Sequence, residues 1–184
     1  MSVKNKNWTV RNKADDKEVS EKLLANRELN SEAEIDAFIN IDKVDGLHDP
    51  YLMKDMEKAV HRLTQAIERK EKIIVFGDYD VDGITGAAIL VHTLQRAGGL
   101  VSYRIPNRVK DGYGLNMRFI DEFINIGVGL VITVDCGISC KDEVTKAVAS
   151  GVDVIITDHH SVPDEPPNDA CAIVHPLQSD CNYP

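Results

Sequence analysis

Acidic and imidazole side chains gather in three clusters after residue 77, and each cluster directly follows an apolar run. The members are Asp78, Asp80, Asp82, Asp135, Asp158, His159 and His160. Carboxylate oxygens and imidazole nitrogens bind divalent cations, and they also transfer protons in hydrolysis. Metal-assisted hydrolysis is therefore the chemistry that these residue types allow.

The number of carboxylates favours metal ions over a purely structural role. Like charges that share one pocket repel each other, so five uncompensated carboxylates would raise one another's pKa or unfold the loops. Two divalent cations would supply four positive charges. Oxygen ligands with one or two imidazoles suit Mn²⁺ or Mg²⁺ better than structural zinc. We therefore predict a site for two Mn²⁺ or Mg²⁺ ions.

Two other motifs begin in the same way as the first cluster. A calcium-binding EF-hand loop that starts at Asp78 would need a bidentate Glu at its twelfth position, where this chain has Ile89. The nucleophilic loop of haloacid-dehalogenase-type phosphatases has its first Asp directly after the apolar strand, whereas residues 77–79 precede Asp80 here. That phosphatase motif also has no use for the Asp-His-His cluster.

The elements that must position these clusters alternate between strand and helix. Apolar runs typical of strands occupy 73–76, 100–105, 130–134 and 154–156, and helical patterns occupy 83–97, 116–126 and 139–150. This order predicts an α/β fold: a doubly wound, mainly parallel sheet with helices on both faces. Because ligands bind beyond the carboxyl ends of parallel strands, the three clusters should converge on one pocket.

An N-terminal helical segment precedes this α/β part. Ser31 and Glu34 have capping-box spacing, and an apolar stripe with helical spacing follows Pro50. We expect residues 1–70 to form helices that pack on the core, and residues 71–184 to form the catalytic domain. The acidity belongs to the second part, because residues 1–70 carry 13 basic and 14 acidic side chains.

Composition limits the partners and the compartment. The net charge of −9 argues against a broad basic face for nucleic acid, so any contact with nucleic acid must be local. No stretch resembles a signal peptide or a membrane span, so we expect a cytoplasmic protein without a membrane partner. The four cysteines lack CxxC spacing, and we interpret them as reduced thiols.

Several runs carry a family resemblance. IIVFGDYDVDGITGAAIL at 73–90, ITVDCGI at 132–138 and TDHH at 157–160 resemble the first three motifs of the DHH phosphoesterases. The stretch from Ile105 to Leu115 is similar to a segment of the RecJ branch, the single-strand-specific 5′-to-3′ exonucleases of repair and recombination. Residues 26–29 and 47–50 also resemble that branch, so the resemblance covers nearly the whole chain.

The resemblance implies roles for the clustered residues. Asp80, Asp82, Asp135 and His159 would bind metal, with Asp135 bridging two ions and Asp78 beside them. His160 would contact the scissile phosphate, and Asp158 would orient the set. In the RecJ segment the substrate contacts would come from Arg108, Gly112, Tyr113 and Gly114. The reaction would be hydrolysis of a phosphodiester in single-stranded DNA, with a single-strand-binding protein or a helicase as a further partner.

The chain also departs from the family pattern. A fourth-motif Asp, a second catalytic subdomain and an oligonucleotide-binding module are expected in the family, and this sequence ends before them. We therefore expect the 184 residues to fold but to bind metal weakly and to hydrolyse DNA poorly. The alternatives are a phosphodiesterase of the same superfamily that cleaves cyclic dinucleotides or short oligonucleotides, and a non-catalytic scaffold. A scaffold, however, has no reason to keep five mutually repelling carboxylates.

Overall fold

The structure, a computed structural model, describes residue 9 and residues 18–40 and 47–184. Contacts divide the chain into two units, Met1–Leu47 and His48–Pro184. In the first unit the described helices are α1 (Val19–Asn26) and α2 (Glu32–Ile39). The capping box predicted at the start of α2 is confirmed, because Ser31 accepts from the Glu34 amide and Glu34 accepts from the Ser31 amide.

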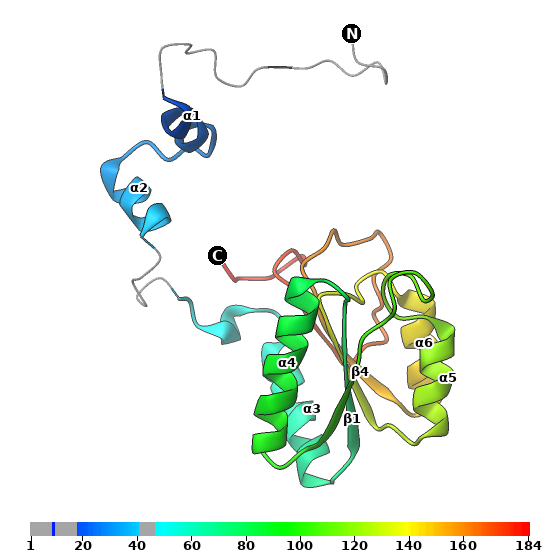
Figure 1. The fold of residues 1–184 in the computed structure, drawn as a ribbon. Helices are drawn as coiled ribbons and strands as arrows, with labels where there is room; N and C mark the ends of the chain where they lie inside the picture. The colour runs from blue at the N-terminus through cyan, green and yellow to red at the C-terminus, as the bar shows by residue number, and fades with distance from the viewer. Residues whose placement is uncertain (1–8, 10–17, 41–46) are drawn as a thin grey trace. The chain divides into compact units, whose positions relative to one another are not determined.

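The second unit is built on one parallel sheet, which confirms the predicted α/β class (Figure 1). Its strands are β1 (Lys72–Gly77), β2 (Leu100–Arg104), β3 (Leu130–Val134), β4 (Asp153–Thr157) and β5 (Ala172–Val174), in the order β2-β1-β3-β4-β5. The sequence did not predict β5, because three apolar residues after a proline-rich loop are too few for a periodic pattern.

Helices cover both faces of the sheet, as predicted (Figure 1). A short 3₁₀ helix η2 (Pro50–Leu52) precedes α3 (Met56–Glu68), and the crossovers are α4 (Val81–Arg96), α5 (Met117–Asn125) and α6 (Lys141–Ala149). Ile73 and Val75 of β1 pack in the core shared with α3 and α4, whereas Ile74 and Phe76 pack in the core of α5 and α6. Successive β1 side chains thus face opposite helical layers, as a buried parallel strand requires.

We expected a boundary between two parts of the chain after residue 70, and the contacts place the division elsewhere. It falls after Leu47, because Ala59 and Ala66 of α3 are buried in the core of the sheet. The helical stripe predicted from Pro50 onward is also interrupted. Asp55 has φ of 62° in the left-handed region, so α3 begins only at Met56.

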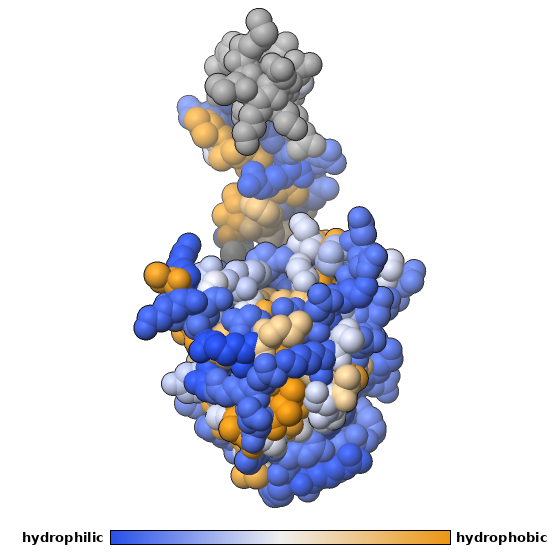
Figure 2. Space-filling view, turned by 90° about the vertical axis from the view of Figure 1, so that its right-hand side faces the viewer, coloured by the Kyte–Doolittle hydropathy of each residue, from blue (hydrophilic) through white to orange (hydrophobic). Residues whose placement is uncertain are grey.

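Helices α5 and α6, which cover one face of the sheet, are amphipathic. Phe119, Ile120 and Phe123 of α5 are buried against the sheet. The surface that this side of the molecule presents is mostly hydrophilic, with small hydrophobic patches (Figure 2). Among the described residues, no helix combines the length and the apolar character needed to cross a membrane.

Candidate metal centre

The three clusters leave the sheet in one row. The register aligns Gly77 of β1, Val134 of β3 and Thr157 of β4, so the residue after each strand lies beside its neighbour. The Asp78 amide donates to the Val134 carbonyl at 3.1 Å, and the Asp135 amide donates to the Thr157 carbonyl at 3.0 Å. The hydrogen-bonding ladder therefore places Asp78 and Asp135 side by side.

The first cluster turns from β1 into α4. Asp80 caps the helix and accepts from the Gly83 amide at 3.2 Å, and this bond holds the pKa of the Asp80 carboxyl below its usual value. Gly83 is needed because a Cβ at that position would lie 2.5 Å from the Asp78 carbonyl oxygen. Asp78 is buried, and burial raises its pKa. The turn thus brings two carboxylates with opposite pKa shifts together.

Asp135 is the central carboxylate. Its backbone has φ of 61°, a left-handed conformation that Asp tolerates better than most residues. Oδ1 lies 2.8 Å from His159 Nε2, and buried Oδ2 has no hydrogen-bond partner. Burial, a contact with Asp80 and the charge of Asp82 raise the Asp135 pKa, against the opposing bond from His159. The positive charge near Asp135 is therefore too small to stabilise its ionised form fully.

The third cluster is organised by Asp158. Its Oδ2 accepts from the Ile138 amide at 2.9 Å, and its Oδ1 accepts from the amides of His159 and His160 at 2.7 and 3.1 Å. Oδ1 also lies 2.7 Å from His160 Nδ1. Burial would raise the Asp158 pKa, but these hydrogen bonds outweigh it and the pKa is lowered. Asp158 is thus an ionised support under the two histidines.

His160 is held in one ring orientation. Nδ1 donates to Asp158, and this bond raises the His160 pKa. The Tyr113 hydroxyl lies 3.1 Å from the same nitrogen and donates to the Asp135 carbonyl at 3.3 Å. Because Nδ1 already contacts Asp158 and Tyr113, Nε2 is the ring nitrogen left for a ligand.

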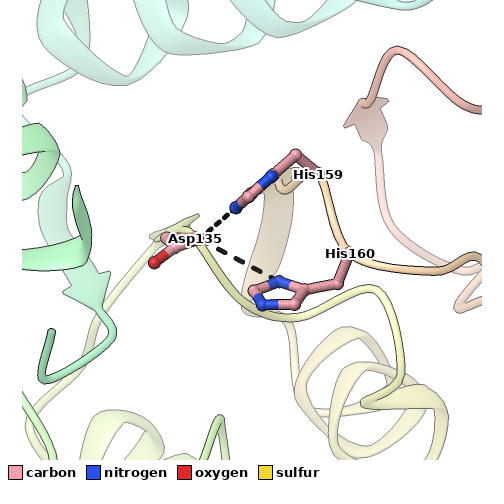
Figure 3. Close-up of side chains that lie close together, drawn as sticks. All are labelled: Asp135, His159 and His160. Atoms are coloured by element: carbon pink, nitrogen blue, oxygen red, sulfur yellow. Dashed lines mark hydrogen bonds and ion pairs between the residues drawn. The ribbon is translucent and has the colours of Figure 1, made fainter. Parts of the chain in front are cut away.

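Donor atoms form two groups that share Asp135. One group is Asp78, Asp80 and Asp135, the other is Asp135, His159 and His160, and within each group the donor atoms lie within 4.8 Å of one another. Both imidazoles point toward Asp135 (Figure 3). Asp82 stands at the side, with Oδ2 3.8 Å from His159 Nε2. The oxygen-rich donor set and the unpartnered Asp78 Oδ1 and Asp135 Oδ2 fit hard divalent cations.

The RecJ-like segment borders this centre. The Arg108 guanidinium lies over the Tyr79 ring at 5.0 Å and helps to lower the pKa of Asp78 against the effect of burial. Gly112 and Gly114 both have φ of 77°, which favours glycine, and they flank Tyr113. The predicted substrate residues therefore lie on one loop, and Tyr113 connects that loop to His160.

Sequence reasoning missed two contributors to the site. The Ile138 amide carries no side-chain signal, so no pattern indicates its bond to Asp158. His175 follows the apolar residues 172–174 just as the three clusters follow their strands. That spacing is the signal that could have identified it, had β5 been predicted.

The family assignment agrees with this geometry. The pattern of the DHH family, N-terminal domain, matches residues 72–182, so the chain belongs to the DHH family, and the predicted resemblance is confirmed. Within that family it is similar to the single-stranded-DNA-specific exonuclease RecJ of Bacillus subtilis, at 43% identity over 88% of this chain and 20% of the relative. It is also 33% identical to the Haemophilus influenzae protein of that name over 99% of this chain and 31% of the relative.

Solved structures agree with the sequence relatives. A crystal structure of exonuclease RecJ bound to manganese has a TM-score of 0.65 at 39% identity, over 69% of this chain and 32% of that chain. RecJ of Thermus thermophilus in complex with Mn²⁺ has a TM-score of 0.60 at 36% identity, over 71% of this chain and 18% of that chain. The chain thus spans less than a third of the length of these relatives.

Proposed function

We propose that this chain is the metal-binding part of a phosphodiesterase that degrades single-stranded DNA from the 5′ end. The observation that carries the proposal is the sharing of Asp135 by two groups of cation ligands. Two ions bridged by one carboxylate are typical of enzymes that cleave phosphodiesters. The relatives named single-stranded-DNA-specific exonuclease support the substrate, and the direction of digestion rests on the family resemblance alone.

The ligands divide between the two groups. Asp80, Asp135 and His159 would hold the ions with Asp78 beside them, and Asp82, which belongs to neither group but lies 3.8 Å from His159, would complete the ligand set. Mn²⁺ is supported by the manganese-bound similar structures, and Mg²⁺ remains the alternative. When bound, the ions would neutralise phosphate charge and activate a water molecule. Without them Asp135 keeps a buried, unpartnered oxygen, which is costly.

Other residues would bind and orient the substrate. With Nδ1 held by Asp158, the Nε2 atom of His160 can donate to a phosphate oxygen, and its raised pKa favours the protonated ring. Arg108 is the guanidinium of the adjoining loop, and guanidinium groups match phosphate geometry. Tyr113 positions His160, while Gly112 and Gly114 leave room for a nucleotide strand beside the backbone.

A titration of the 184-residue chain with Mn²⁺ tests the metal assignment. Isothermal calorimetry should detect Mn²⁺ binding to the parent chain, and Asp135→Asn should weaken it by at least ~10-fold because both ions lose a ligand. Glu68→Gln is the matched control. Glu68 ends α3 just before β1 begins, so it lies near the amino-terminal end of that strand, whereas the metal centre lies beyond the carboxyl ends of the strands. Equal affinity of Asp135→Asn and the parent chain would refute the shared site.

An activity assay distinguishes the substrate classes. The chain is incubated with Mn²⁺ and a 5′-phosphorylated single strand, and Asp82→Ala is the inactive reference. Release of 5′-mononucleotides by the parent chain alone supports the exonuclease. Preferential cleavage of a cyclic dinucleotide would support the related phosphodiesterase instead.

A further inference from the structure

His175 is a buried histidine at the end of the strand that the sequence motifs do not include. The register pairs Thr157 of β4 with Val174 of β5, and the Asp158 amide donates to the Val174 carbonyl at 3.3 Å. His175 therefore continues the row that begins with Asp78, Asp135 and Asp158. Its side chain is fully buried, whereas 46% of the His160 side chain is exposed.

Both ring nitrogens of His175 bind backbone groups. Nε2 lies 2.7 Å from the carbonyl oxygen of His160, and Nδ1 lies 3.0 Å from the amide of Leu177. A carbonyl can only accept and an amide can only donate. The partners therefore assign the proton to Nε2 and a lone pair to Nδ1, so the ring is a neutral imidazole with both nitrogens satisfied. A ring bonded at both ends has one orientation.

The His160 carbonyl needs a partner from elsewhere in the fold. Residues 159–171 form neither helix nor strand, so no regular element holds the peptide after His160. Asp158 holds the His160 amide and ring, and His175 holds its carbonyl. The backbone of His160 is thus fixed from two neighbouring strand ends.

We propose that His175 is a positioning residue: it sets the direction in which the His160 ring faces Asp135 and His159, the other members of its donor group. The hydrogen bond from the buried Nε2 prevents rotation of the peptide between His160 and Ser161. The imidazoles of His159 and His160 then remain directed toward Asp135 without rearrangement. The functional consequence rests on the proposed function, but the bond itself does not.

Two variants separate the two bonds of His175. His175→Gln places an amide nitrogen near the position of Nε2 and keeps a donor for the His160 carbonyl. His175→Asn places its amide near the position of Nδ1, so it keeps a partner for Leu177 but cannot reach His160. The two side chains differ by one methylene group, so their packing losses are similar.

The expected result is a difference between the variants in the binding of phosphate, because the proposed function gives His160 the phosphate and not the metal. In the presence of Mn²⁺, His175→Gln should bind a 5′-phosphorylated oligonucleotide within about twofold of the parent chain, and His175→Asn should bind it at least ~10-fold more weakly, the effect of losing one charge-assisted hydrogen bond. Urea unfolding should show a comparable loss of stability in both. Equal oligonucleotide affinity of the two variants would overturn the proposal.

A measurement on the unmodified chain does not depend on whether the variants fold. In ¹⁵N NMR spectra recorded without metal, His175 should have a protonated Nε2, an unprotonated Nδ1 and a coupling across the hydrogen bond to the His160 carbonyl. A proton on Nδ1 would overturn the proposal. Should the parent chain bind no Mn²⁺, the proposed function fails, and the resonances of the His160 ring then decide the positioning role. His175→Asn should shift them more than His175→Gln, and equal shifts would refute the role.

Discussion

The Nε2 atom of His159 lies 2.8 Å from Oδ1 of Asp135, although 24 residues and a complete helix separate the two in the chain. The imidazole thus meets the carboxylate at an oxygen whose partner, Oδ2, is buried without a hydrogen bond. Burial and the neighbouring charges raise the pKa of Asp135, so the metal-free arrangement is costly for the ionised form. A cation would supply the missing positive charge.

Asp135→Asn should therefore stabilise the metal-free chain. A carboxyl whose folded-state pKa is raised opposes folding at neutral pH, and this penalty disappears as the pH falls and the group is protonated. We expect a rise in Tm of about 2–4 °C at pH 7, the shift that about 1 kcal/mol produces in a domain of this size. Thermal unfolding in a chelator measures it, and the gain should shrink at pH 4. A lower Tm for the variant at pH 7 would contradict this view of Asp135.

Mn²⁺ should reverse that ranking. A ligand that binds only the folded state raises Tm, and an excess of about 100 times Kd contributes about 2.7 kcal/mol. The parent chain should therefore gain several degrees on addition of Mn²⁺, while Asp135→Asn gains little. The same scans with Glu68→Gln provide the control, which should behave like the parent chain under both conditions.

Gly83→Ala should disrupt the first loop. The added Cβ would lie 2.5–2.8 Å from the backbone of Asp78, which cannot move without breaking its ladder bond to Val134. We expect a loss of about 1–3 kcal/mol in the free energy of unfolding, measured in urea, together with weaker Mn²⁺ binding.

Gly86→Ala in the same helix is the comparison for that substitution. Its Cβ would lie 2.7 Å from one side-chain methyl group of Val134 and near no backbone atom, and alanine favours the helix by about 1 kcal/mol. The loss should therefore be smaller than for Gly83→Ala. Equal losses in the two variants would mean that the approach of Gly83 to Asp78 is not the limiting contact.

Arg108→Ala should weaken the binding of a 5′-phosphorylated oligonucleotide more than that of its 5′-hydroxyl counterpart. One charge-assisted contact with phosphate contributes about 1.5–3 kcal/mol, which corresponds to roughly 10- to 100-fold in Kd. Fluorescence anisotropy with both oligonucleotides measures the difference. Arg96→Ala, in the last turn of α4, removes the same charge and should change neither value. Identical losses for both oligonucleotides would remove Arg108 from the phosphate site.

Arg62→Met should reduce stability without affecting the metal centre. Arg62 of α3 donates to Asp153 and Glu71, each at 2.6 Å, and to the Gly129 carbonyl at 3.3 Å. Removing this partly buried guanidinium leaves Asp153 without its ion pair and Glu71 with only Arg69, at 3.8 Å, so we expect a loss of about 2 kcal/mol in urea unfolding. Calorimetry should give an unchanged Mn²⁺ affinity under native conditions. The Arg62 contacts lie at the amino-terminal ends of the strands, whereas Asp135 follows the carboxyl end of β3.

The amino-acid sequence was enough to predict the alternation of strands and helices and the position of each acidic cluster after a strand. Both follow from local patterns: apolar runs that must be buried, glycines that end helices, and polar residues at the point where a run stops. The family resemblance could be identified from the same residues, because its motifs are contiguous. Even the capping box of α2 needed only the spacing of Ser31 and Glu34.

Which of these residues contact one another depends on the fold as a whole. The register of β1, β3 and β4 brought Asp78 beside Asp135, the left-handed backbone of Asp135 turned its side chain to His159, and β5 placed His175 under His160. These contacts join residues far apart in the chain, and they depend on strand order, register and single backbone dihedrals. No local pattern encodes those quantities, because they result from the packing of the whole sheet.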